Sequence, residues 1–176
     1  MNEYEFTLKF SLQDTSSHPE TYIDKLWVEG CDDALVGIGK NGHISLDFTR
    51  ESSSAQDAIV SALEDVKRAI PKAKLIEATP DFVGLTEIAN FVGFTHQNLN
   101  ELMISSGSAF PIPVHEGKSS TIWHLFNVLV WLKEQKNYPI EERLIDIAKT
   151  NMRFNIAKEA YKIEPIFQQK IRALIT

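Results

Sequence analysis

Apolar and polar residues alternate along several stretches of the N-terminal half of the chain, with the two-residue period of a strand that buries one face. Tyr4–Phe10 is the first such stretch and His43–Phe48 is the next, and the apolar run Ala34–Ile38 before it is predicted to be a short strand. Between these last two, Lys40-Asn41-Gly42 predicts a tight hairpin turn, because Asn-Gly readily adopts the positive φ angles that such a turn requires. A further strand is predicted at Lys74–Ala78.

Two stretches of helical periodicity lie between these strands. The first follows the polar turn Asp14–Pro19, repeats apolar residues over Tyr22–Trp27 and ends at Gly30. The second begins at Ser53 or Ser54, since either can cap a helix. The strand and helix order predicts an α+β protein in which residues 1–80 form a ferredoxin-like βαββαβ domain, with its helices on one face of an antiparallel sheet. The apolar face of the second helix consists of Ala58, Ile59, Ala62, Leu63 and Val66.

After Pro80 the pattern changes to two short helices that meet at a glycine. Leu85–Val92 has one apolar face, on which the small Ala89 allows a second helix to cross closely. Gly93 stands where the chain must leave this helix at positive φ, and Thr95 can cap a helix that runs to about Ser105. This spacing is the physical pattern of a helix-turn-helix. The residues expected to fill the core around the turn are Phe94, Leu99 and Leu102 or Met103, and Phe91, Trp123 and Trp131 are also expected to be core residues.

The pattern continues downstream with Phe110-Pro111-Ile112-Pro113-Val114 and with an apolar stretch, Trp123–Leu132. The whole segment resembles the winged helix-turn-helix of the MerR-type and excisionase-type (AlpA-like) families of bacterial and phage DNA-binding proteins. The resemblance covers about fifty residues within 81–136 and implies a wing whose tip is 115–120, followed by a closing helix. It covers neither residues 1–80 nor 137–176, although the layout as a whole is similar to small bacterial DNA-binding proteins with such a module after an αβ domain.

The resemblance implies a recognition helix that enters the major groove of double-stranded DNA. The side chains of Gln97, Asn98 and Asn100 each present a paired donor and acceptor that suit adenine. The chain departs from the family in having no Arg or Lys between Thr95 and Ser106, and Trp123-His124 where an Arg is common. The DNA-contacting residues implied are Thr86, Thr95, His96, Gln97, Asn98, Asn100, His115, Lys118, Ser119, Ser120 and Thr121.

Residues 137–176 are predicted to form two helices, Ile140–Thr150 and Arg153–Leu174, with a kink at Pro165. Each helix has an apolar stripe, so this C-terminal extension is a candidate dimerisation surface. A module with few basic residues is expected to bind DNA weakly as a monomer, and a homodimer on a pseudo-palindromic site would compensate.

Composition places the chain among ordinary globular proteins, with 43% hydrophobic and 24% charged residues among 176. There is no apolar run long enough to cross a membrane and no secretory signal, so a cytoplasmic protein without membrane contact is expected. The net charge is −6 and is uneven: residues 1–80 carry 8 Lys+Arg and 14 Asp+Glu, whereas 81–136 carry 3 and 5, and 137–176 carry 7 and 5. This acidity argues against a general nucleic-acid coat.

Enzymatic chemistry finds no support in the sequence. The chain has no phosphate-binding glycine loop or nucleophile elbow, and its five His residues lack close metal-ligand spacings, so no catalytic residue, cofactor or metal is predicted. Cys31, the single cysteine, excludes an internal disulfide and has no obvious base nearby.

Three functional hypotheses remain open. The first is a sequence-specific regulator that binds DNA as a dimer. The second is an adaptor or antitoxin-like protein whose acidic N-terminal domain docks a protein partner such as a basic toxin or nuclease, with the helix-turn-helix vestigial or serving as a contact surface. The third is ligand sensing by the N-terminal domain, which rests on fold analogy alone.

Overall fold

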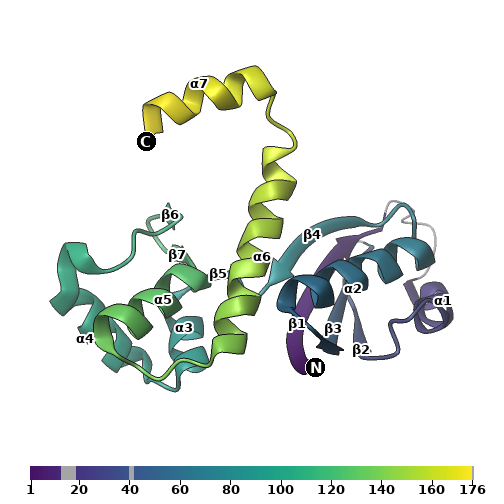
Figure 1. Ribbon diagram of the computed structural model, residues 1–176, viewed down its shortest axis with the longest axis horizontal. Coiled ribbons are helices and arrows are strands. Elements are labelled where there is room, and N and C mark those ends of the chain that lie inside the picture. The colour runs from purple at the N-terminus through teal and green to yellow at the C-terminus, as the bar shows by residue number, and fades with distance from the viewer. Residues whose placement is uncertain (13–18, 40–41, 176) are drawn as a thin grey trace.

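The computed structural model describes residues 1–12, 19–39 and 42–175, and it is a mixed α and β protein with two antiparallel sheets (Figure 1). The N-terminal sheet and its helices lie on one side, a smaller helical module lies on the other, and the long helix α6 stands between them. None of the described helices combines the length and apolar character that crossing a membrane requires. The elements of the N-terminal part are β1 (Asn2–Ser11), η1 (Pro19–Tyr22), α1 (Ile23–Val28), β2 (Ala34–Ile38), β3 (His43–Ser52), α2 (Ala55–Ala69) and β4 (Lys74–Thr79).

The N-terminal sheet has the strand order β2-β3-β1-β4, and every neighbouring pair is antiparallel. The register places Phe6 opposite Phe48 and Leu8 opposite Leu46, so the buried positions of β1 and β3 share one face. The four predicted strands are therefore confirmed. The predicted turns at Lys40-Asn41-Gly42 and Asp14–Pro19 fall largely outside the described residues, although Gly42 has the positive φ of 70° that a tight turn favours.

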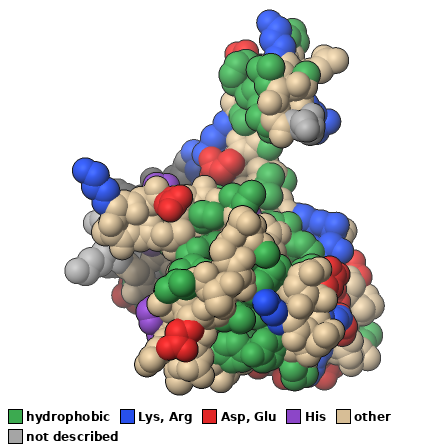
Figure 2. All heavy atoms as spheres, turned by 90° about the vertical axis from the view of Figure 1, so that its left-hand side faces the viewer, with side chains coloured by type: hydrophobic (Ala, Val, Ile, Leu, Met, Phe, Trp, Pro, Cys, Tyr) green, Lys and Arg blue, Asp and Glu red, His purple; other side chains and the backbone are tan. Residues whose placement is uncertain are grey.

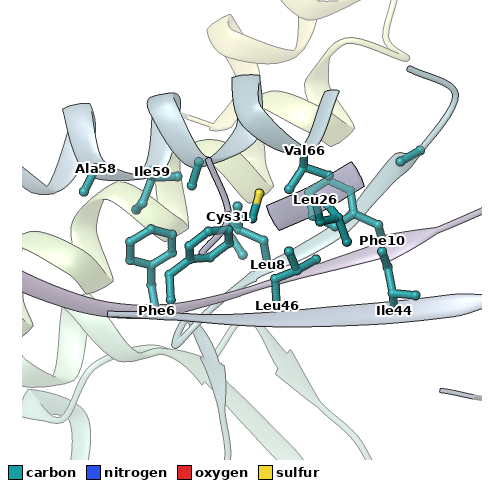
Figure 3. Close-up of a cluster of buried hydrophobic side chains, with 14 of the residues drawn as sticks. Phe6, Leu8, Phe10, Leu26, Cys31, Ile44, Leu46, Ala58, Ile59 and Val66 are labelled. Atoms are coloured by element: carbon teal, nitrogen blue, oxygen red, sulfur yellow. The ribbon is translucent and has the colours of Figure 1, made fainter. Parts of the chain in front are cut away.

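Helix α2 covers the buried face of this sheet. Ser54 caps it as predicted, because its hydroxyl oxygen accepts a hydrogen bond from the backbone N–H of Asp57 at 3.0 Å. Helix α1 has one buried residue, Leu26, whereas Trp27 is 66% exposed. The side chains that meet between α2 and the sheet include Phe6, Leu8, Phe10, Ile44, Leu46, Ala58, Ile59 and Val66 (Figure 3).

Cys31 belongs to this core rather than to a reactive site. Burial, and secondarily the nearby Asp65 carboxylate, raise the pKa of its thiol to about 12. At pH 8 only about 10⁻⁴ of the thiol would be ionised, and the thiolate is the reactive form. We expect negligible alkylation by iodoacetamide in the native protein and rapid alkylation in denaturant, as measured by mass spectrometry. Native alkylation as fast as that of a small free thiol would contradict this assignment.

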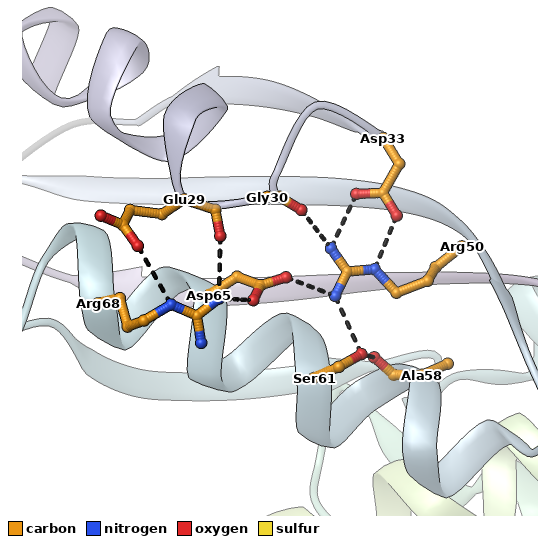
Figure 4. Close-up of polar contacts among 8 residues, drawn as sticks. All are labelled: Glu29, Gly30, Asp33, Arg50, Ala58, Ser61, Asp65 and Arg68. Carbon is orange, nitrogen blue, oxygen red and sulfur yellow. Dashed lines mark hydrogen bonds and ion pairs between the residues drawn. The ribbon is translucent and has the colours of Figure 1, made fainter.

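A buried arginine joins β3 to the loop before β2 and to α2 (Figure 4). The Arg50 side chain donates to both carboxylate oxygens of Asp33, at 2.7 and 2.9 Å, and to Asp65 at 2.7 Å. It also donates to the Ser61 hydroxyl at 3.0 Å and to the Gly30 carbonyl at 2.7 Å, so all five of its N–H groups are used. Burial acts to lower the pKa of Arg50, but the hydrogen bonds to Asp33 and Asp65 raise it above its ordinary value.

Arg68 extends this network at the surface. It contacts Asp65 and donates to the carboxylate of Glu29 at 3.1 Å and to the Glu29 carbonyl at 3.0 Å. The network therefore ties the end of α1 to α2 through paired charges.

The central module has a separate core. Its buried residues come from both helices of a corner, from the strand beside them and from the helix that closes the module. A small sheet with the order β5-β7-β6 lies against these helices. The elements are β5 (Phe82–Val83), α3 (Leu85–Val92), α4 (His96–Ser106), η2 (Gly107–Ala109), β6 (His115–Glu116), β7 (Thr121–His124) and α5 (Leu125–Lys136).

The C-terminal helices differ from the prediction. Helix α6 (Glu142–Ala160) runs without a break past Thr150, and α7 (Pro165–Ile175) begins where a kink was expected. Thr150 and Asn151 are buried inside α6, and the Asn151 amide donates to a backbone carbonyl instead of marking a helix end. Proline suits the first position of a helix, where its missing N–H costs nothing, so the chain starts a new helix at Pro165. Helix α6 packs on α2, β1 and β4 on one side and on α5 on the other, and it thereby joins the two cores.

Candidate nucleic-acid interface

The corner between α3 and α4 is built around Gly93. This glycine has φ +71° and ψ 25°, the left-handed conformation that residues with a Cβ rarely adopt. The N–H of Phe94 donates to the carbonyl of Ala89 at 2.8 Å, which closes the end of α3. Ile88, Ala89 and Leu99 are almost fully buried where the two helices cross. The sequence-based prediction of a helical corner at Gly93 is therefore confirmed.

The first turns of α4 carry the exposed polar side chains of this corner. Thr95 caps α4, its hydroxyl oxygen accepting from the Asn98 N–H at 3.1 Å. Thr95, His96, Gln97 and Asn98 are exposed, and Asn100 is half-buried. The Gln97 amide donates to the Glu101 carboxylate at 3.0 Å along the helix surface. The structure thus brings these five predicted residues together, while Thr86 lies exposed on α3.

The short hairpin β6–β7 carries the other predicted residues. His115 pairs with Ile122 and Glu116 with Thr121, so His115 lies in a strand and the tip is confined to 117–120. The Gly117 N–H donates to the Ser120 carbonyl at 2.8 Å and closes that tip. The exposed residues here are His115, Lys118, Ser119 and Ser120, and Thr121 is half-buried.

Aromatic packing supports the hairpin from below. Phe110 meets Trp123 and Trp131 edge-on, with ring centroids 5.9 and 5.0 Å apart, and the Trp123 indole N–H donates to the Pro111 carbonyl at 3.0 Å. The prediction that both tryptophans are core residues is confirmed. Phe91 was expected to be core as well, and that expectation is wrong: it is 43% exposed and lines a groove together with residues of β1, β3 and α6. Phe94 is half-buried and packs edge-on against Tyr138 at 4.8 Å.

The electrostatic character of this end of the molecule is close to neutral. Figure 2 faces the side on which the central module lies, and it is mostly tan and green with few blue side chains. Helix α4 carries no Lys or Arg, and its one charged residue is Glu101. Lys118 and Glu116 lie close together in sequence on the hairpin. Base-edge hydrogen bonding by amides is therefore the stronger capability of this surface, and phosphate binding is the weaker one.

A buried polar junction, which sequence reasoning missed, fixes the central module to α6. The fully buried Asp81 carboxylate lies 2.7 Å from His124 Nδ1 and accepts from the Asn155 amide at 2.8 Å. Asn155 also accepts from the N–H of Ala78 at 2.9 Å and donates to its carbonyl at 2.8 Å. Asn151 donates to the Pro80 carbonyl at 3.2 Å. One signal in the sequence could have indicated the junction: Ala148, Asn151 and Asn155 recur at helical spacing, which places both asparagines on the buried face of α6.

Across residues 1–12, 19–39 and 42–175, no group of three or more His, Cys, Asp or Glu side chains is arranged to hold a metal ion.

Beside α4, a shallow groove of about 520 Å³ lies near the predicted site. Its lining consists of Phe94, Asn98, Glu101, Leu102, Ser105 and Tyr138.

Comparison with known proteins gives no further guide: no protein-family model matches the chain, and no curated protein or solved structure is detectably similar to it.

Proposed function

We propose that the protein is a sequence-specific regulator that binds double-stranded DNA as a dimer through α4 and the β6–β7 hairpin. One observation carries the proposal: the left-handed Gly93 turns α4 so that Thr95, His96, Gln97 and Asn98 are all exposed at its N-terminal end. A helix presented in this way has the shape and the donor–acceptor pairs to read bases in a major groove.

Two further observations support finer assignments. The hairpin β6–β7 followed directly by α5 supports assignment of residues 81–136 as a winged helix-turn-helix, with α4 as recognition helix. The strand order β2-β3-β1-β4, with α1 and α2 connecting strands that are not neighbours, supports a ferredoxin-like assignment for residues 1–80.

The first test is selection from a random duplex library at low salt, followed by sequencing of the bound fraction. The proposal expects enrichment of one inverted repeat, since two copies of α4 would read two half-sites. The absence of any retained duplex at low salt would remove the proposal and favour the adaptor hypothesis.

Removing the two amides at the start of α4 is expected to abolish the sequence preference. The variant is Gln97→Ala with Asn98→Ala, and each lost bidentate contact would cost about 1–3 kcal/mol of discrimination against other bases. Competition between the selected duplex and a scrambled duplex measures the effect. The matched control is Asn127→Ala with Gln135→Ala, which removes two exposed amides from α5 and should keep the preference. Unchanged discrimination in the α4 variant would move the reading surface elsewhere.

Lys118 is expected to contact the phosphate backbone of the DNA and not the base edges. Lys118→Ala should weaken binding to selected and scrambled duplexes by similar factors and reduce the slope of log K against log[salt] by about 1 per lost phosphate contact. Fluorescence anisotropy titrations at several salt concentrations measure both quantities. Lys72→Ala, an exposed lysine after α2, is the control and should leave both unchanged. If both substitutions weakened binding equally, Lys118 would act only through the net charge of the protein and not through a direct phosphate contact.

A further inference from the structure

Helix α7 is linked to the end of α6 by its first turns, where the Gln168 amide donates to the Ala160 carbonyl at 2.9 Å. None of its side chains is buried, and it projects from the end of α6 as a separate arm (Figures 1 and 2). At helical spacing, Phe167, Ile171 and Leu174 form one apolar stripe, and Leu174 is 85% exposed. An isolated helix of 11 residues is marginal in water, and its stability normally comes from packing of its apolar face. We therefore expect this apolar stripe to pack against a partner surface.

A second unpartnered surface lies at the other end of α6. An open groove of about 860 Å³ runs from the start of β2 across β3 and β1 to the N-terminal end of α6. Leu35, which is 77% exposed, and Phe91 supply apolar surface there. The groove residues that carry exposed carboxylates without an ion pair among the described residues are Glu3, Glu5, Asp32 and Asp47.

The charges of the two surfaces are complementary. Helix α7 carries Lys170 and Arg172 and no acidic residue, and Lys170 flanks the apolar stripe at helical spacing. The one basic residue that lines the groove, Arg143, is paired with Glu141. An apolar stripe bordered by lysine thus fits an acidic groove with exposed Leu35 and Phe91, whereas two copies of α7 would bring like charges together.

In the described conformation, most of the length of α6 separates α7 from the groove of the same chain. From Ile147, which lines the groove, to Ala160 at its end, α6 rises about 20 Å. In Figure 1, α7 lies beyond the C-terminal end of α6, and the groove residues of α6 lie at its N-terminal end. The groove of a second copy, with α6 running in the opposite direction, has no such constraint.

We propose that α7 of each chain docks into this groove of a second copy, so that two chains exchange their C-terminal helices across a two-fold axis. The biological role of this dimer rests on the proposed function, which uses two copies on one DNA site. Its existence is tested without DNA, so failure of either proposal leaves a distinct result.

Sedimentation equilibrium of the full chain over a wide range of concentration is the test, and it is expected to show a dimer. Phe167→Asp should raise the dissociation constant by at least about 100-fold, because it places a charge in the centre of the buried stripe. Gln169→Asp adds the same charge to the opposite face of α7 and should leave the dimer intact. Both variants should keep the circular dichroism melting curve of the monomer, since α7 buries no side chain.

Charge reversal tests the groove itself. Lys170→Glu alone, and Glu5→Lys with Asp47→Lys, should each weaken the dimer by about tenfold, and the three changes combined should bind more tightly than either set alone. A monomer at all concentrations overturns the proposal and leaves α7 for a different protein. A dimer that is lost with Phe167→Asp but insensitive to the groove changes also overturns it, because α7 would then pair with itself.

Discussion

Replacing Arg50 with methionine is expected to lower the free energy of unfolding by about 3–5 kcal/mol, because it removes one partner from a buried charge network. Arg50 is 8% exposed and supplies donors to Asp33, Asp65, Ser61 and the Gly30 carbonyl. Methionine fills a similar volume, so the loss comes from Asp33 left without a counter-charge and Asp65 left with Arg68 alone, rather than from a cavity. Urea unfolding followed by far-ultraviolet circular dichroism measures the effect.

Two comparison variants make this result specific. Arg50→Lys keeps the charge but cannot form the planar bidentate contact with Asp33, so its loss should fall between those of wild type and Arg50→Met. Arg153→Met removes an exposed arginine of α6 and should change stability by less than about 0.5 kcal/mol. If Arg50→Met were no more harmful than Arg153→Met, the network would contribute nothing to the fold.

Replacing Asn155 with leucine is the second change with a large expected effect, about 3 kcal/mol. It leaves the N–H and carbonyl of Ala78 and one oxygen of Asp81 buried without that partner. Because this junction connects the N-terminal sheet, the central module and α6, the two cores should also lose their coupling. Far-ultraviolet circular dichroism reports both cores, whereas in a Trp27→Phe background the fluorescence of the buried Trp123 and Trp131 reports chiefly the central one.

The expected pattern is one coincident unfolding transition in wild type and two separated transitions in Asn155→Leu. Gln135→Leu, which makes the same kind of replacement at an exposed position of α5, should keep the single transition. If the two signals of Asn155→Leu changed together at the urea concentration at which wild type unfolds, the junction would not couple the cores.

The parts of the fold that the sequence predicted are those specified by local patterns. Alternation located β1 and β3, because each of these strands buries one face, and Gly93 with Thr95 located the corner between α3 and α4. These signals depend on neighbours within a few residues, so they can be read before the tertiary structure is known.

The features that escaped prediction depend on contacts between distant segments. Asn151 and Asn155 look like helix-breaking or surface residues, yet their partners lie more than seventy positions earlier in the chain. Arg50 follows Phe48 on the buried face of β3, where the pattern alone would predict an apolar residue, and only the fold brings Asp33 and Asp65 to it. The exposure of α7 was equally hidden, because an apolar stripe predicts burial without saying against which surface.

The central claim, that DNA is read by the start of α4 and backed by the β6–β7 hairpin, is tested most directly by nuclear magnetic resonance of the isotope-labelled protein. Adding the selected duplex should shift or broaden the amide signals of residues 95–100 and 117–120 first, and leave those of β2 and α2 nearly unchanged. Perturbation centred on the N-terminal domain, or no perturbation at low salt, would contradict the claim.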